Sequence, residues 1–132
     1  MKTNLITNTV RVDFVVGSPT DVATGKATHS TIQSAIDAAI NGQRIFVLAG
    51  TYAEVLTVGK RLTIFGMGYD SYVNGNITFT ATTSNFSRVE KMRFGQNITL
   101  NGSYIFFMDN YRASAFTLSD TGTSNAIFGI DY

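Results

Sequence analysis

The chain of 132 residues has no cysteine, one histidine and one proline. The lack of cysteine excludes disulfides, thiolate nucleophiles and sulfur-ligated metal sites. His29 has no second imidazole with which to share a metal, and its place just before a predicted helix favours a solvated loop residue over a general base. We therefore expect no metal site, no cofactor and no catalysis by histidine.

Charge and long apolar runs are scarce as well. Charged residues make up 14% of the chain and the formal net charge is +1, which provides no field for nucleic acid or a membrane surface. No apolar run reaches the roughly 18 residues of a membrane span. Polar residues interrupt the N-terminal segment, so that no signal peptide is expected. These features predict a protein made in the cytoplasm, with neither nucleic acid nor membrane as a partner.

The chain does contain enough hydrophobic residues, 44%, for one folded domain. Residues 1–16 are rich in β-branched types and alternate loosely, which predicts an extended N-terminal arm that reaches a neighbouring subunit. Residues 17–26 hold the single proline and two glycines, and are expected to form a loop. We divide the chain into this arm, residues 1–16, and one domain, residues 17–132.

Residues 31–41 carry the one convincing helical pattern. Their apolar residues recur at helical spacing. Ser30 and Gln33 have the spacing of a capping box, and Gly42 after Asn41 supplies a left-handed stop. A short helix with a single apolar face has to cover something, and the segments that follow are its expected partner.

Three apolar, strand-like segments come next, at residues 44–48, 54–58 and 61–65. Glycine-containing corners separate and follow them, at residues 49–52, 59–60 and 66–68. Connections this short cannot carry a helical crossover between parallel strands of one sheet. The segments therefore form either hairpins or successive sides of a coil.

A repeat further along the chain favours the coil. Four triplets of an apolar residue, a threonine and a second apolar residue begin at residues 56, 77, 98 and 116, with offsets of 21, 21 and 18. A period of about 20 residues without an internal helix is typical of a β-solenoid. The predicted ladder consists of Thr57, Thr78, Thr99 and Thr117, with Asn76 and Asn97 as a column of bonded amides beside it. The predicted core stack consists of Leu56, Val58, Ile77, Phe79, Ile98, Leu100, Phe116 and Leu118.

A second apolar column is predicted on another side of the coil. Its spacing is uneven, which we attribute to loops of different length between the turns, above all around residues 80–87. The segments assigned to it are residues 46–48, 62–64, 92–94, 105–107 and 127–128.

Several short motifs follow one another between residues 30 and 68. They are Ile32-Gln33 and Ala35-Ile36 in the helix, Arg44-Ile45-Phe46-Val47, Ala49-Gly50-Thr51-Tyr52, Glu54-Val55, Leu62-Thr63-Ile64 and Gly66-Met67-Gly68. This segment resembles the opening of the pectin-lyase-like family of right-handed parallel β-helices, which includes pectinesterases and many bacteriophage tail proteins. The resemblance implies an all-β fold, a short right-handed single-stranded parallel β-helix with an N-terminal capping helix at about residues 31–41. The phage members further imply a homotrimer with its coils side by side.

The same resemblance raises the question of catalysis. Pectinesterase-like enzymes place two aspartates, an arginine and glutamines on later turns, and the residues of matching type here are Asp109, Asp120, Asp131 and Arg112. General acid and base catalysis requires such carboxylates close together with separated pKa values. Asp109 is the best single candidate, but an aspartate in a turn usually bonds nearby backbone. No paired catalytic motif is recognisable, so we expect no enzymatic activity.

The aromatic residues point to assembly. Ten Phe and six Tyr, many of them in the last part of the chain, fit a coil interior and a subunit contact better than a sugar-stacking surface. Residues 125–132 are apolar and strand-like, and would leave an uncovered sheet edge at the C-terminal end of the coil. Both features predict an oligomer.

The leading hypothesis is a non-enzymatic bacteriophage virion protein, a trimeric β-helix that decorates or cements the capsid. Attachment to the tail is the second location. The arm would bind the major capsid protein or another virion protein. The alternative is a carbohydrate-active or polysaccharide-binding β-helix protein, either a pectinesterase-like hydrolase or a receptor binder of the tailspike type. A fragment of a bacterial surface repeat is a third reading.

Overall fold

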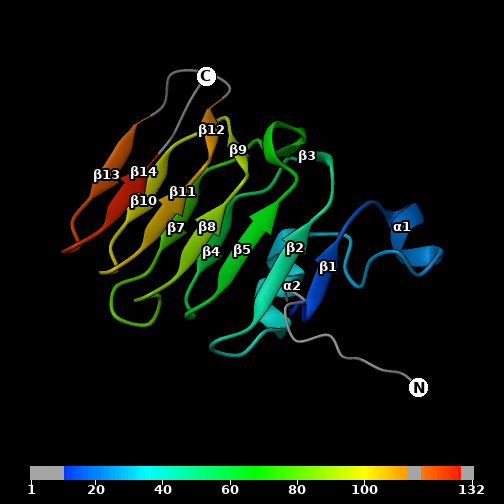
Figure 1. The fold of residues 1–132 in the computed structure, drawn as a ribbon, viewed down its shortest axis with the longest axis horizontal. Helices are drawn as coiled ribbons and strands as arrows, with labels where there is room; N and C mark the ends of the chain where they lie inside the picture. Colours follow the sequence, from blue (N-terminus) through cyan, green and yellow to red (C-terminus); the bar gives the residue numbers. More distant parts are fainter. Residues whose placement is uncertain (1–10, 113–116, 129–132) are drawn as a thin grey trace.

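The structure, a computed structural model, describes residues 11–112 and 117–128. Within these residues the chain winds into a single-stranded parallel β-helix of about four turns (Figure 1). Each turn contributes one strand to each of three sheets, and every pairing between named strands is parallel. The predicted all-β fold, a parallel β-helix with a helix near its N-terminal end, is confirmed.

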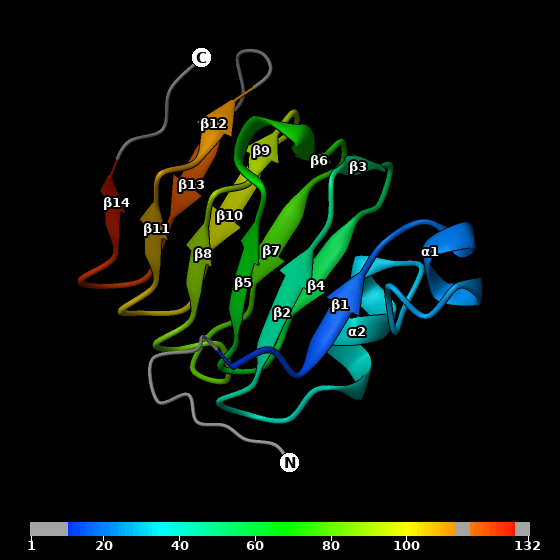
Figure 2. The ribbon, with the colours of Figure 1, turned by 45° about the vertical axis from the view of Figure 1, so that its right-hand side comes forward.

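The three sheets form three sides of the coil (Figure 2). The six-stranded sheet has the order β1 (Phe14–Val16), β2 (Arg44–Val47), β5 (Thr63–Gly66), β8 (Arg88–Glu90), β11 (Phe106–Met108) and β14 (Ala126–Phe128). The second sheet has β3 (Gly50–Tyr52), β6 (Ser71–Val73), β9 (Arg93–Phe94) and β12 (Tyr111–Arg112). The third has β4 (Leu56–Val58), β7 (Ile77–Phe79), β10 (Ile98–Leu100) and β13 (Leu118–Asp120).

The core is built from residues that stack in register along the third sheet. Strands β4, β7 and β10 align residue for residue, so that Thr57, Thr78 and Thr99 form one outward column. Because side chains alternate across a strand, the residues on either side of each threonine point inward. These inward residues are 0–2% exposed: Leu56, Val58, Ile77, Phe79, Ile98 and Leu100.

The asparagines next to this column also connect successive turns. The Oδ1 atom of Asn76 accepts a hydrogen bond from the backbone N–H of Asn97, at 3.1 Å, and Oδ1 of Asn97 accepts one from the N–H of Thr117, at 2.9 Å. Each amide therefore bonds the backbone of the next turn rather than the next amide. The bonds satisfy backbone donors at a corner, where the sheet ladder does not reach them.

The last triplet of the repeat lies in a different register from the predicted one. Ile98 pairs with Leu118 and Thr99 with Ser119, so the fourth rung begins at residue 118 instead of 116. Thr117 consequently occupies the asparagine position and not the threonine ladder. Leu118 is 40% exposed and is not part of the buried core. Phe116 lies outside the described residues.

The second column also differs from the prediction. Residues 92–94 belong to the second sheet through β9, and β8 takes their expected place in the six-stranded sheet. The inward column of that sheet consists of Ile45, Ile64, Val89, Phe107 and Ile127. The predicted corner at residues 49–52 contains a strand, β3, whose Tyr52 points inward and is 7% exposed.

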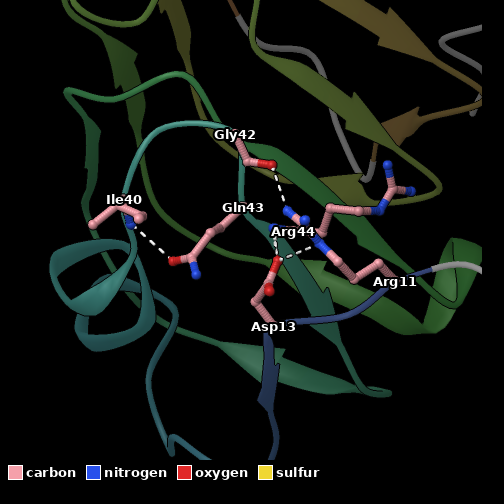
Figure 3. A network of polar contacts seen from close by, with 6 residues as sticks. All are labelled: Arg11, Asp13, Ile40, Gly42, Gln43 and Arg44. Carbon is pink, nitrogen blue, oxygen red and sulfur yellow. Dashed lines mark hydrogen bonds and ion pairs between the residues drawn. The ribbon is translucent and has the colours of Figure 1, made fainter.

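The first described residues join the coil. β1 pairs with β2, so residues 14–16 of the predicted arm form the first strand of the six-stranded sheet. Just before it, the carboxylate of Asp13 accepts a hydrogen bond from the backbone N–H of Arg44, at 2.9 Å (Figure 3). Arg11 forms an ion pair with Asp13, at 3.3 Å, and donates to the carbonyl of Gly42. The chain is thus held to the coil from residue 11 onward.

The segment predicted as a loop contains a short helix, α1 (Pro19–Ala23). Ser18 and Asp21 form its capping box, and Pro19 occupies its first turn. Hydrogen bonds to the Ser18 backbone and hydroxyl lower the pKa of Asp21. The sequence predicts a loop there because serine, proline and aspartate are turn residues, but the same residue types also begin helices.

The capping helix, α2 (Ile32–Ala38), is shorter than predicted and begins at a different cap. Thr31 is the N-cap residue instead of Ser30, and its hydroxyl accepts from the N–H of Ser34. The backbone N–H groups of Ile32 and Gln33 donate to the carboxylate of Glu54, at 2.8 and 3.0 Å. A carboxylate from the coil therefore replaces the predicted Ser30–Gln33 capping box.

The other end of α2 is also held by the coil. The ammonium group of Lys60 donates to the carbonyls of Ile36, Asp37 and Ala39, at 2.6–2.9 Å. Gly42, with φ of 90°, provides the predicted left-handed turn after the helix. The apolar side of α2 packs against β1, β2 and β4 and closes the N-terminal end of the core. No helix among the described residues is long and apolar enough to cross a membrane.

Replacing Ile98 by alanine tests the register of the core stack. Ile98 is fully buried between Ile77 and the next turn, so we expect a loss of about 2–5 kcal/mol in the free energy of unfolding. The matched control is Thr99→Ala on the outward side of the same strand, for which a change below about 1 kcal/mol is expected. Urea titration measures both. Equal losses for the two variants would contradict the assigned register.

Ionisation of Tyr52 is expected to lower the stability of the protein at alkaline pH. Its hydroxyl donates to the Leu48 carbonyl, at 2.9 Å, and burial, assisted by the charges of Asp21 and Glu54, raises its pKa to about 12. The folded state thus favours the neutral phenol. The free energy of unfolding is therefore unaffected by Tyr52 ionisation below pH 10 and falls as the pH rises from 10 to 12. Tyr52→Phe should flatten that decline in urea titrations at several pH values. An unchanged slope would contradict the assignment.

Candidate interaction surface

The outward sides of the three sheets differ in chemistry. The third sheet exposes a column of small hydroxyl side chains: Thr57, Thr78, Thr99 and Ser119. We call this side the threonine face. Small hydroxyls are well hydrated and offer little apolar area to a partner. The other two sides carry large aromatic and cationic side chains instead.

The outward side of the six-stranded sheet, which we call the aromatic face, has two parallel rows. One row consists of Val15, Phe46, Phe65, Glu90 and Met108. The other consists of Arg44, Thr63, Arg88 and Phe106. The phenylalanine, methionine and arginine residues of these rows belong to the types that are enriched at protein interfaces.

Contacts within and between the rows of the aromatic face hold its side chains in place. The rings of Phe46 and Phe65 lie 5.0 Å apart, and the guanidinium of Arg44 lies 5.1 Å from the Phe65 ring. Arg88 forms an ion pair with Glu90, at 3.1 Å, and its guanidinium lies 5.9 Å from the ring of Phe106. Side chains that are already ordered lose less conformational entropy when a partner covers them.

The second sheet presents a compact cluster that we call the tyrosine face. It comprises Tyr69 in the 3₁₀ turn η1 (Gly68–Asp70), Tyr72 in β6, Arg93 in β9 and Tyr111 in β12. The Arg93 guanidinium lies 4.0 Å from the ring centres of both Tyr69 and Tyr72. Tyr111 meets Tyr69 edge to face, at 5.9 Å. Two cation–π contacts thus fix one arginine on the outside of the coil.

The surroundings of the cluster explain how it is positioned. Arg93 follows Tyr72 in register, one turn along the coil, and Tyr111 follows Arg93. Gly95 leaves room for the Tyr72 ring, because a Cβ atom there would collide with the tyrosine hydroxyl. That hydroxyl donates to Asn74, at 3.3 Å. Tyr72, Arg93 and Tyr111 are 21 and 18 residues apart, which are offsets of the triplet repeat, so the period could have indicated this column. The sequence instead predicts Arg93 in the second apolar column, with residues 92–94.

The predicted candidates for catalysis do not form an acid–base pair in the described part of the chain. Asp109 is exposed at the corner between β11 and β12, with a left-handed φ of 54°. Asp120 lies on the third sheet, where its carboxylate accepts from Gly122 and Asn125. Arg112 lies on the second sheet, and Asp131 falls outside the described residues. The two described aspartates are thus on different sides of the coil.

Two further candidate groups, His29 and Lys60, are engaged in the fold. His29 contacts the Thr28 hydroxyl, at 3.0 Å, and meets the ring of Phe14 edge to face. A hollow of about 370 Å³ at the C-terminal end of α2 includes Lys60, whose ammonium already bonds the helix carbonyls. No group of three potential metal ligands occurs among residues 11–112 and 117–128. The aromatic and tyrosine faces are therefore the candidate interaction surfaces of the described chain.

Arg93→Met tests whether the tyrosine face is held by its cation. Methionine keeps an apolar stem but removes both cation–π contacts, so we expect the free energy of unfolding to fall by about 1–2 kcal/mol. Arg61→Met is the matched control, because Arg61 is exposed, and it should change stability by less than about 0.5 kcal/mol. Thermal and urea unfolding measure the difference. Equal changes in the free energy of unfolding for the two variants would show that the stacked guanidinium of Arg93 does not contribute to stability.

No family model, no curated protein and no solved structure matches the chain.

Proposed function

We propose that this chain is a non-enzymatic structural protein of a bacteriophage particle, a homotrimeric β-helix that decorates or cements the capsid. One observation carries the proposal. Two of the three sides of the coil carry ordered aromatic and arginine side chains, as the surface of a subunit contact would. The tail is the second location that the proposal allows.

The architecture supports a role in assembly over catalysis. A parallel β-helix is a stiff rod, since each turn is bonded to the next along three sheets. The aromatic and tyrosine faces are the outer sides of two β-sheets, whereas sites for small substrates are concave. Arg11 and Asp13 tie the start of the described chain to the coil, which suits a preceding segment that attaches to another protein. In the proposal this segment binds the major capsid protein or another virion protein.

The resemblance of residues 30–68 to pectin-lyase-like β-helices supports the viral setting, because bacteriophage tail proteins share that opening. The motif residues of the resemblance have structural roles that the geometry accounts for. Glu54 caps α2, Tyr52 bonds the Leu48 carbonyl, and Gly66 is buried where a Cβ would meet Ser71 and Met92. These residues explain the start of a coil without requiring an active site.

A second candidate function, polysaccharide binding, is favoured by the tyrosine face alone. Tyr69, Tyr72 and Tyr111 expose rings next to a fixed guanidinium, and aromatic rings stack on sugars in many binding proteins. A hydrolase of the pectinesterase type would need a second carboxylate near Asp109. The described residues place Asp120 on another side of the coil, so binding is the better form of this alternative.

Two measurements test the proposed function. Mass spectrometry of purified particles from the source should find this chain at many copies per particle, and light scattering of the purified protein should give about three times 14.3 kDa. A stable monomer at micromolar concentration, or absence from the particles, would contradict the structural proposal.

The enzymatic alternative has its own test. The purified protein is incubated with pectin and with bacterial capsular polysaccharide, and the release of methanol or reducing sugar is followed. We expect no turnover. Turnover that is abolished by Asp109→Asn would overturn the non-enzymatic proposal, while binding without turnover that is lost in Tyr72→Ala would favour the polysaccharide binder.

A further inference from the structure

The corner that joins the third sheet to the six-stranded sheet carries two exposed aromatic rings. Phe86, 57% exposed, and Tyr104, 43% exposed, stack face to face, with ring centres 4.9 Å apart and 3° between their planes. We call this pair the corner stack. We infer that residues 1–10 of the same chain, which lie outside the described residues, dock along the corner stack in the free protein, with Leu5 and Ile6 on its rings.

The two rings of the corner stack occupy equivalent positions on successive turns. Phe86 lies two residues before β8 and Tyr104 two residues before β11, and these strands pair in register. Both residues have a left-handed backbone, with φ of 67° and 58°. Gly42 before β2 and Ser124 before β14 occupy the same position, with φ of 90° and 57°. A glycine or a serine is therefore sufficient to form this corner.

Aromatic residues are unfavourable at such a position. In the left-handed region the Cβ atom of an L-residue lies too close to the following carbonyl oxygen, and for a bulky residue such a φ is an outlier. Strained backbone of this kind is concentrated at functional sites. Full burial in the described chain does not offset the strain, because each of the two residues remains about half exposed. A segment that covers the rings would supply the missing burial.

Residues 1–10 join the described chain at the same corner. Arg11 donates to the carbonyl of Gly42, at 3.1 Å, and Asp13 accepts from the backbone N–H of Arg44, at 2.9 Å (Figure 3). In the register of the six-stranded sheet, Gly42 is the equivalent of Phe86 two turns earlier. The chain before Arg11 therefore starts at one end of the row of corner positions that contains the corner stack.

The length of this segment matches the distance to the rings. In the six-stranded sheet β8 lies three strands from β1 and β11 lies four, which is about 14 and 19 Å at about 4.8 Å per strand. An extended chain spans about 3.3 Å per residue. Ile6 and Leu5, five and six residues before Arg11, therefore reach about 17 and 20 Å. These reaches bring them level with Phe86 and Tyr104.

The composition of the segment suits an apolar contact. Residues 3–10 carry no charged side chain, so their docking removes no charge from water. Leu5 and Ile6 are adjacent aliphatic residues that can cover aromatic rings. The covalent link favours the segment of the same chain over other occupants, because a tethered segment has an effective concentration on the order of millimolar. A contact too weak to join separate molecules is then populated.

Docking on the corner stack has a consequence for binding by the N-terminal segment. A docked segment is not free for another molecule. Any partner that binds residues 1–10, including the virion protein of the proposed function, has to displace them from the rings. The inference concerns the free chain and does not depend on that function.

Disulfide trapping tests where the segment lies, because the chain has no cysteine. Asn4→Cys is combined with Ser124→Cys, which follows Tyr104 along the corner, or with Val55→Cys, a 74% exposed site between β3 and β4. Oxidised glutathione joins the two thiols and is itself reduced. We expect the pair with Ser124→Cys to close at least about tenfold faster than the pair with Val55→Cys. Equal rates would overturn the inference.

A second comparison tests the rings themselves. In the protein with Asn4→Cys and Ser124→Cys, the changes Phe86→Asn and Tyr104→Asn remove both rings and introduce a residue type that tolerates a left-handed backbone. Closure of the disulfide should slow at least about tenfold. Tyr69→Asn removes a similarly exposed ring from another corner and should leave the rate unchanged. Circular dichroism checks the fold of each variant. An unchanged rate without the two rings of the corner stack would contradict the docking site.

Isotope labelling identifies the chain that supplies the segment. Heavy-labelled and unlabelled proteins with Asn4→Cys and Ser124→Cys are mixed before oxidation, and the linked peptides are analysed by mass spectrometry. Disulfides within one chain support the inference. Disulfides that join a labelled to an unlabelled chain would overturn it, because the occupant would then be a second copy. A monomer in light scattering contradicts the proposed trimer, whereas closure within that monomer still supports docking in the same chain.

Discussion

The in-register stacking of successive turns is the interaction on which the rest of this structure depends. Each strand has only two to four residues, so no strand is stable without the strands before and after it. Parallel pairing along three sheets supplies those neighbours, and the inward side chains of each turn land on those of the previous one. The asparagine bonds at Asn76 and Asn97 add a polar connection at a corner. Stability is thus distributed along the coil, as in other repeat proteins.

A coil of this kind fixes its outward side chains as firmly as its core. Residues in one outward column are one strand spacing apart, which is the distance at which aromatic rings and guanidinium groups stack. Arg93 beside Tyr72, and Phe46 beside Phe65, follow from this spacing. The α2 helix closes the N-terminal end because Glu54 and Lys60 hold its two termini. Core and surface columns therefore follow from one repeat, and the cap is held by two side chains of the coil.

The sequence predicted the parts of the fold that repeat without interruption. The triplets at residues 56, 77 and 98 have the same chemistry and the same offset, so the coil and its threonine column could be read directly. β8 was missed because Arg88 and Glu90 flank its one inward residue, Val89, and the more apolar segment at residues 92–94 took its place. The predicted position of the last rung is wrong because Phe116-Thr117-Leu118 has the same pattern of residue types as the triplets. The register is set instead by the hydrogen bond that the N–H of Thr117 donates to Oδ1 of Asn97. The tyrosine face joins residues from three turns, and no local pattern contains it.

The most direct measurement of the central claim is a three-dimensional reconstruction of the assembled protein by electron cryo-microscopy, alone or on the particle. The proposed function predicts three parallel β-helical coils side by side. A single isolated coil would contradict it.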